Sequence, residues 1–203
     1  MNAAAITTRA KTRPRYTSPG RLWMLASERA ERLGMKIMVR EVNSENQWTW
    51  NGKELSIGCV NRLNHLQLTH EASHWLVAPA WRRSEPGFGL GREPNGYPGV
   101  KNELVHSWRA DREECLATIL DGVVLMSWRA SPTSIVEWFD AIYTGNGEIV
   151  KGFDGIKGKR LWSSRRNCMR FKRDVDWLQQ RGLFNGMNAF IEDFVRLVTP
   201  NTY

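Results

Sequence analysis

Apolar and polar positions alternate with two different periods in the first part of the chain, and each period predicts a type of element. Between residues 21 and 33 the apolar side chains return every three or four positions, which predicts a helix that ends at Gly34. Residues 36–42 alternate instead and predict a strand. β-Prone residues on both sides of Asn51-Gly52 predict a hairpin, because this pair readily adopts the positive φ angles of a tight turn.

Helical spacing dominates the rest of the chain. The expected helices cover residues 62–77, 102–128, 132–143, 159–180 and 187–198. A loop rich in glycine and proline, at residues 82–99, separates the first two of them. This order of elements predicts an α+β fold with a small antiparallel or mixed sheet and a helical C-terminal extension. We expect three parts: a flexible basic arm (1–19), a main domain (20–144) and a basic helical extension packed on it (145–203).

The composition is that of an ordinary globular protein with an excess of positive charge. Of the 203 residues, 41% are hydrophobic and 25% are charged, and no apolar stretch approaches the length of a membrane span. The three cysteines form no CxxC pair, which favours a reducing compartment, so we expect a cytoplasmic protein without a membrane partner. The net charge of +8 reflects basic residues gathered in the arm and between residues 151 and 181.

The second basic segment is a candidate surface for nucleic acid. Its expected helix interleaves basic and aromatic residues, and the candidate phosphate contacts are Lys159, Arg166, Arg170 and Arg173. The alternative is a solvated basic face whose aromatic side covers the core, since charge runs alone are weak indicators of a partner. No nucleic-acid-binding motif supports the reading of bases.

Candidate catalytic chemistry is concentrated in the string His70-Glu71-Ala72-Ser73-His74, which is an HExxH motif. Residues four apart project from one face of a helix, so the two imidazoles can bind a single zinc ion. Glu71 lies next to the first histidine, where it can act as general base on a water polarised by that ion. The alternative is a helix with two satisfied core histidines beside a surface glutamate.

A catalytic zinc site usually takes a third protein ligand. The extended pattern HExxHxxGxxH is not met, because Val77 and Ala80 occupy its last two fixed positions. Glu113, on the helix after the loop, is in phase with the apolar side of that helix, where a carboxylate is costly unless it is paired or bound to a metal. We therefore expect Glu113 as the third ligand. Glu114, in phase with a more polar side, is the competitor, and both could instead belong to a solvated acidic cluster.

The order of helix, strands with a hairpin, HExxH helix, loop and second glutamate-bearing helix resembles the zincin metallopeptidases with a glutamate ligand. Residues 111–117 (DREECLA) resemble the second motif of the ImmA/IrrE-like peptidases, a group typical of phages and mobile elements. The resemblance covers residues 21–128 and implies a zincin-like fold and a zinc-dependent endopeptidase, often acting on a transcriptional repressor. Glu114 and Cys115 depart from the pattern of that family, in which alanine and asparagine are commoner.

The expected site also predicts how a peptide bond would be hydrolysed. Zinc would polarise a water and the scissile carbonyl, while Glu71 would pass the proton of the water to the leaving amine. His106 and Tyr97 are the candidate stabilisers of the transition state. The resemblance to zincins also implies that the strand at residues 54–60 lies at a sheet edge, where an extended substrate would pair with it. The loop at residues 82–99 is expected to form a flap over the metal.

Two functions follow from these features. The first is a zinc-dependent metallopeptidase that hydrolyses a peptide bond in a protein substrate, such as a regulatory or DNA-associated protein. The second is a catalytically silent binding protein on a zincin scaffold, either a phage structural protein or a regulator that contacts DNA through the basic arm and helix. A metalloprotease that also binds DNA would combine the two.

Overall fold

The computed structural model describes residues 15–40, 49–58, 65–90, 107–143 and 165–199. The elements of this part are α1 (Pro19–Arg32), β1 (Lys36–Arg40), β2 (Thr49–Trp50), β3 (Glu54–Gly58), α2 (His65–Val77), α3 (Ser107–Ser127), α4 (Pro132–Tyr143), α5 (Arg165–Gln180) and α6 (Asn188–Val198). Two 3-10 helices follow α2, namely η1 (Ala80–Arg82) and η2 (Pro86–Gly89). The result is a mostly helical α+β fold with the expected order of elements. Within the described residues, no helix combines the length and the apolar character that crossing a membrane requires.

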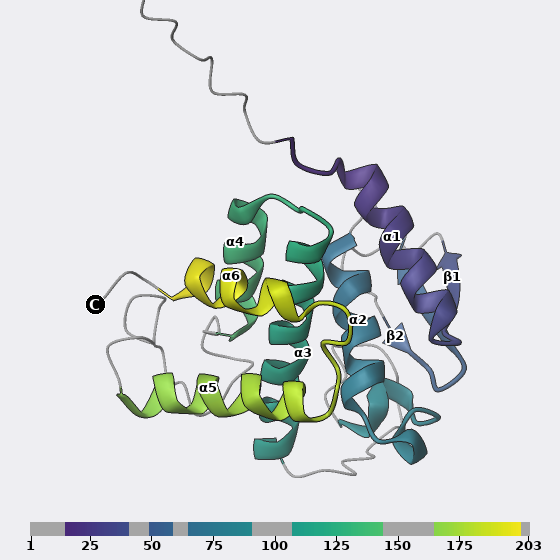
Figure 1. Ribbon diagram of the computed structural model, residues 1–203. Coiled ribbons are helices and arrows are strands. Elements are labelled where there is room, and N and C mark those ends of the chain that lie inside the picture. The colour runs from purple at the N-terminus through teal and green to yellow at the C-terminus, as the bar shows by residue number, and fades with distance from the viewer. Residues whose placement is uncertain (1–14, 41–48, 59–64, 91–106, 144–164, 200–203) are drawn as a thin grey trace, which may run out of the picture.

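Helix α3 is the central element of the fold (Figure 1). Helix α2 lies along one side of it, with α1 and the small sheet beyond α2, and α4, α5 and α6 cover the other side. Every residue from Cys115 to Leu125 is buried. A helix surrounded in this way has no solvated face, so its polar residues must find partners inside the protein.

The three strands form one mixed sheet in the order β1-β3-β2. Strand β1 pairs with β3 in parallel, from Lys36 opposite Glu54 to Arg40 opposite Gly58, whereas β2 pairs with β3 in the antiparallel sense. The expected mixed sheet is therefore present in the described residues. The expectation that the strand starting at Glu54 lies at an edge is wrong for its described part, because β3 lies between β1 and β2. Pairing with β2 occupies the second side of β3 at Leu55 and Ser56.

The expected hairpin is present, and its turn is held from both sides. The side chain of Asn51 accepts hydrogen bonds from the backbone N–H groups of Lys53 and Glu54, both at 2.9 Å. Gly52 has a φ of 91°, and a Cβ at this position would lie 2.1 Å from the carbonyl oxygen of Ser84. Glycine is therefore required both for the turn and for the contact with the segment that follows η1.

The start of the described chain is hydrogen-bonded to the residues that directly follow α3. Thr17 donates from its backbone N to the carbonyl of Arg129 at 3.0 Å and from its hydroxyl to the carbonyl of Trp128 at 2.7 Å. Ser18 then caps α1 by accepting from the backbone N of Arg21. The flexible arm expected over residues 1–19 is thus too long at its C-terminal end; residues 1–14 lie outside the described residues.

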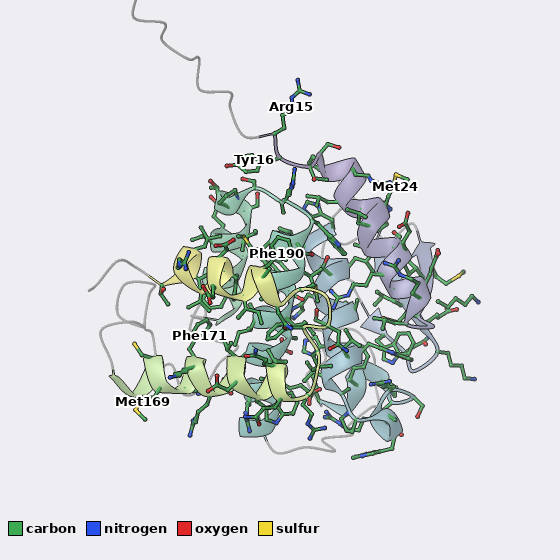
Figure 2. All side chains as sticks on the ribbon, viewed as in Figure 1. Arg15, Tyr16, Met24, Met169, Phe171 and Phe190 are labelled. Carbon is green, nitrogen blue, oxygen red and sulfur yellow. The ribbon has the colours of Figure 1, made fainter. Side chains whose placement is uncertain are left out.

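The larger apolar core joins α3 to the C-terminal helices. Its centre holds Phe139 of α4, Phe171 of α5 and Phe194 of α6, whose ring centroids are 5.6 to 6.5 Å apart. Figure 2 shows Phe171 on the side of α5 that faces α6, whereas Met169 points away. The described part of the expected extension (145–203) therefore shares one core with α3, and α5 covers that core with its aromatic side.

The smaller apolar core lies between α1, α2, the sheet and η2. Its buried side chains include Ala26, Met35, Trp50, Leu55, Leu68 and Phe88. This core fixes α2 from the side opposite α3, so α2 is held between two packed layers.

Gly122 marks a close approach of α6 to α3. A Cβ here would lie 2.0 Å from Cε2 of Phe194, and this ring cannot move aside because it packs against Phe139 and Phe171. We expect Gly122→Ala to lower the free energy of unfolding by about 1–3 kcal/mol, despite the helix preference of alanine, as measured by urea unfolding. In the control Gly20→Ala, the new Cβ has no atom within 4 Å, so stability should not fall. Equal losses in the two variants would contradict the packing argument.

Candidate metal centre

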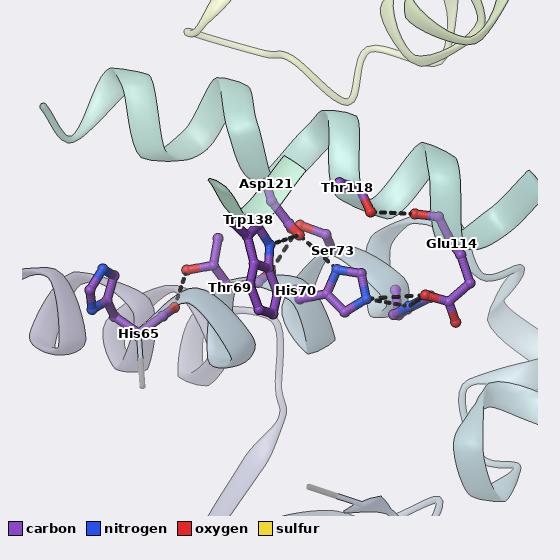
Figure 3. A network of polar contacts seen from close by, with 9 residues as sticks. His65, Thr69, His70, Ser73, Glu114, Thr118, Asp121 and Trp138 are labelled. Carbon is purple, nitrogen blue, oxygen red and sulfur yellow. Dashed lines mark hydrogen bonds and ion pairs between the residues drawn. The ribbon is translucent and has the colours of Figure 1, made fainter. Parts of the chain in front are cut away.

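The two histidines of the HExxH motif lie on the face of α2 that packs against α3. Both are buried, with 7% of His70 and 3% of His74 exposed. Their Nε2 atoms are 3.1 Å apart, and each lies 3.2 Å from Oε2 of Glu114 on α3 (Figure 3). Ligand atoms of a tetrahedral zinc ion at about 2.0–2.1 Å lie about 3.3 Å from one another. The three atoms therefore form a triangle of the size that one face of a zinc coordination tetrahedron needs.

The third member of this group corrects the expectation from helical phase. The metal-binding geometry is met by His70, His74 and Glu114, whereas Glu113 forms a buried ion pair with Arg82 of η1. Glu113 is indeed buried, as its phase predicted, but an arginine rather than a metal compensates its charge. The side of α3 that carries Glu114 contains polar residues because it faces α2 and the histidines, and not because it faces solvent.

Asp121 holds His70 from behind. Nδ1 of His70 donates to Oδ2 of Asp121 at 2.7 Å, and Nε1 of Trp138 donates to the same oxygen at 3.3 Å (Figure 3). A proton on Nδ1 leaves Nε2 with the lone pair that a metal requires. The role of Asp121 is not evident from the motif or from the spacing of the histidines. Its signal was a lone carboxylate two helical turns after Glu114, inside an otherwise apolar run.

The buried charge of Asp121 is balanced by a second cation. Arg29 of α1 interacts electrostatically with Asp121, and burial lowers the pKa of Arg29 to about 10, which keeps the guanidinium charged at neutral pH. Asp121 is fully buried. An unpaired carboxylate at such a position would be strongly destabilising. Arg29 and His70 together therefore place two basic side chains near this buried carboxylate.

The electrostatics of the group favour positive charge between the three atoms. Burial by itself lowers the pKa of both histidines, but Asp121 raises the pKa of His70 well above its usual range and Glu114 raises that of His74. Burial by itself raises the pKa of Glu114, but His74 and His70 hold it well below its usual range. Two imidazole nitrogens and one carboxylate oxygen are also a donor set that catalytic zinc sites use. The residues present thus fit Zn²⁺ both in charge and in donor chemistry.

An aromatic stack covers His74. The ring of Phe88 lies against the imidazole of His74, with centroids 5.7 Å apart and an interplanar angle of 19°, and Trp50 stacks on Phe88 at 5.7 Å and 5°. Trp50 is fixed in turn by a hydrogen bond from its Nε1 to the carbonyl of Arg83 at 2.7 Å. Phe88 has a φ of 55°, which is unfavourable for a bulky residue and is sustained by this packing. The described part of the expected flap therefore covers one ligand.

Glu71 is half-buried beside His70. Burial raises the pKa of Glu71, while the neighbouring His74 and His70 act in the opposite direction. A carboxylate with a raised pKa is a stronger base than an ordinary surface glutamate. The position and the basicity of Glu71 suit the removal of a proton from a water at the histidines.

The structure describes only some of the remaining candidate residues. His106, Tyr97 and Lys159 lie outside the described residues, and Arg166 lies on α5 with its side chain outside them. Arg170 is half-buried and Arg173 is exposed, and both act electrostatically on Asp174 of the same helix.

Comparison of the chain with family models, with curated proteins and with solved structures gave no match. The candidate metal centre therefore rests on the motif and on the geometry described above.

The assignment of Glu114 as the metal ligand and of Glu113 as the ion-pair partner of Arg82 can be tested by substituting each glutamate. Glu114→Gln should lower zinc affinity by more than about 100-fold, because an amide is a weaker zinc ligand than a carboxylate. Glu113→Gln should retain the zinc but lower the free energy of unfolding by about 3 kcal/mol, because it leaves Arg82 buried without a counter-charge. Competition with a chelating indicator measures the first effect and urea unfolding the second. The reverse pattern of zinc loss would reinstate Glu113 as the ligand.

A partner behind a zinc ligand typically contributes 10- to 100-fold in metal affinity. We expect Asp121→Asn to weaken zinc binding by about this factor, because the amide can no longer favour the proton on Nδ1 of His70. Asp176→Asn on α5, at an exposed carboxylate, is the matched control and should leave zinc affinity unchanged. Equal affinities for Asp121→Asn and the unmutated protein would remove Asp121 from the metal centre.

Proposed function

We propose that this protein is a zinc-dependent metallopeptidase of zincin type that hydrolyses a peptide bond in a protein substrate. The observation that carries the proposal is the convergence of His70, His74 and Glu114 on one point, with Glu71 beside the first histidine. Two imidazoles, one carboxylate ligand and a free glutamate are the parts that metal-assisted hydrolysis requires. The resemblance of the HExxH segment to zincin peptidases supports the same reaction class.

Each residue has a distinct role in the proposed reaction. His70, His74 and Glu114 would hold Zn²⁺, which when bound supplies a Lewis acid for a water and for the scissile carbonyl. Glu71 would accept a proton from the attacking water as the oxygen of that water bonds to the carbonyl carbon. It would then donate the proton to the amide nitrogen as the C–N bond breaks. Asp121 keeps the proton of His70 on Nδ1 throughout, so that Nε2 stays directed at the reaction centre.

The stack of Phe88 on His74 excludes water from one side of the ligand group. Phe88 is buried, and its ring shields the imidazole of His74 from solvent. A low local dielectric strengthens the interactions of the charged groups in the site. The packing of η2 thus supports both the orientation of His74 and the electrostatics of the reaction.

The basic residues of α5 predict a second activity, the binding of nucleic acid. Its aromatic side is used for packing, as Phe171 in the core demonstrates, while Arg173 and Lys172 are exposed. Contact of this exposed side with phosphate groups would make the protein a metallopeptidase that acts near nucleic acid. Such binding would weaken steeply with salt, which distinguishes it from a solvated surface.

The proposed catalytic role is tested by Glu71→Gln. The zinc-loaded variant should keep one equivalent of metal but lose at least about 10²- to 10⁴-fold in hydrolysis, because the amide cannot accept the proton. Hydrolysis of casein and of a mixed quenched-fluorescent peptide library, compared with bound zinc, gives the readout. Glu28→Gln, at an exposed site on α1, is the control and should remain fully active.

The catalytically silent alternative makes the opposite prediction for the same proteins. If the unmutated, zinc-loaded protein cleaves none of these substrates and Glu71→Gln changes no binding property, the proposal of a hydrolase is wrong. A zinc site of purely structural function would then explain the three ligands.

A further inference from the structure

A cleft of about 770 Å³ opens where α2 ends, on the flank of the helix pair that carries the metal centre. Its walls come from the end of α2 and the residues after it, from α3, and from the end of α5 with the segment that follows. Val77 lies three residues beyond His74, and Glu113 directly precedes Glu114. At 1.5 Å of rise per residue, the cleft therefore begins within about 5 Å of the metal ligands along α2.

Three guanidinium groups give this cleft its positive charge. Arg83, Arg112 and Arg181 all line it. The carboxylate of Asp174 pairs with Arg112, but none of the described carboxylates pairs with Arg83 or Arg181. The one acidic residue of the lining, Glu113, is neutralised by its ion pair with Arg82. The cleft thus presents two cations that lack a counter-charge among the described residues.

Part of the lining of the cleft is apolar. Val77, Leu116 and Leu183 contribute to it, together with the ring of Trp177. The ring of Trp177 is already in contact with two guanidinium groups, since Cζ of Arg181 is 4.9 Å and that of Arg112 is 5.8 Å from its centroid. This arrangement holds the arginines in place and leaves less of the ring for stacking a nucleobase.

These features favour a peptide over a nucleic acid as the ligand. Clefts of several hundred Å³ match small ligands or a few amino-acid residues rather than a duplex. Arginines that have no counter-charge among the described residues and that share a cleft with apolar side chains are complementary to a segment that alternates carboxylates with apolar side chains. A polynucleotide offers regular charge but no apolar side chains to pack against Val77, Leu116 and Leu183.

We propose that this cleft binds an acidic segment of the protein substrate, with carboxylates at Arg83 and Arg181 and apolar side chains against Val77, Leu116 and Leu183. The inference rests on the proposed peptidase function and names the substrate chemistry of the same site. Val77 follows His74 by three residues and Glu113 directly precedes Glu114, so a segment held in the cleft would lie beside the proposed metal centre. The arginines thereby select substrates that carry negative charge near that bond.

The test measures binding separately from cleavage. The full chain carrying Glu71→Gln and loaded with zinc is titrated into a fluorescent short peptide that alternates glutamate with leucine, and binding is followed by anisotropy. A second peptide with glutamine in place of every glutamate is the uncharged probe, and oligothymidine is the nucleic-acid probe. Arg181 is exposed, so Arg181→Gln should fold normally; Arg181→Lys keeps the charge, and Arg32→Gln, at an exposed site on α1, is the control.

The glutamate peptide should bind at least about tenfold more tightly than the glutamine peptide, and Arg181→Gln should weaken it by about five- to tenfold. Arg181→Lys should recover most of the loss, and Arg32→Gln should have no effect. Equal binding of the two peptides, no measurable binding of either, or an equal loss in the Arg32→Gln control would overturn the inference. Tighter binding of oligothymidine that depends on Arg181 would also overturn it and assign the cleft to nucleic acid.

The outcomes for the cleft and for the peptidase are distinguishable. Charge-dependent peptide binding without hydrolysis by the unmutated protein would sustain the cleft as a binding site and remove the proposed catalysis. Hydrolysis without a preference for acidic peptides would sustain the peptidase and remove the assignment of the cleft.

Discussion

The packing of α2 against the polar side of α3 is the constraint on which the rest of the structure depends. Along this contact the sequence places two histidines on one helix and Glu114 and Asp121 on the other. Each of these groups would be costly in a buried position by itself. Because they meet one another, every charge finds an opposite charge or a hydrogen bond, and the contact becomes a site that favours a cation.

Compensation of buried charge extends outward from this contact in two directions. Behind His70, the negative charge of Asp121 is balanced by Arg29 of α1, so the N-terminal helix takes part in the electrostatics of the centre. At the other end, Glu113 is neutralised by Arg82, and this pair attaches the chain after α2 to α3. The same segment then leads to Phe88, whose ring covers His74. Electrostatic pairing and aromatic packing thus act together to fix the orientation of the ligands.

The proposed substrate cleft depends on the same architecture. The end of α2 and residues of α3 line it, together with Trp177 of α5 and Arg181, which directly follows α5. The C-terminal helices complete the core around Phe194, and the end of α5 with the residue after it supplies part of the positive charge of the proposed cleft.

The sequence by itself determined the features that depend on neighbours along the chain. Spacing along the chain determines the helical periods and places His70 and His74 on one face of α2. Local backbone preference determines where α2 ends and where the chain turns after Asn51. The tertiary structure alone decided which glutamate meets the histidines, that Asp121 lies behind His70, and that β3 is an inner strand. The phase of a helix shows which residues share a face but not what that face packs against. Glu113 was recognised as buried, yet only the position of Arg82, brought next to α3 by the chain after α2, made it an ion-pair partner and left Glu114 to the metal centre.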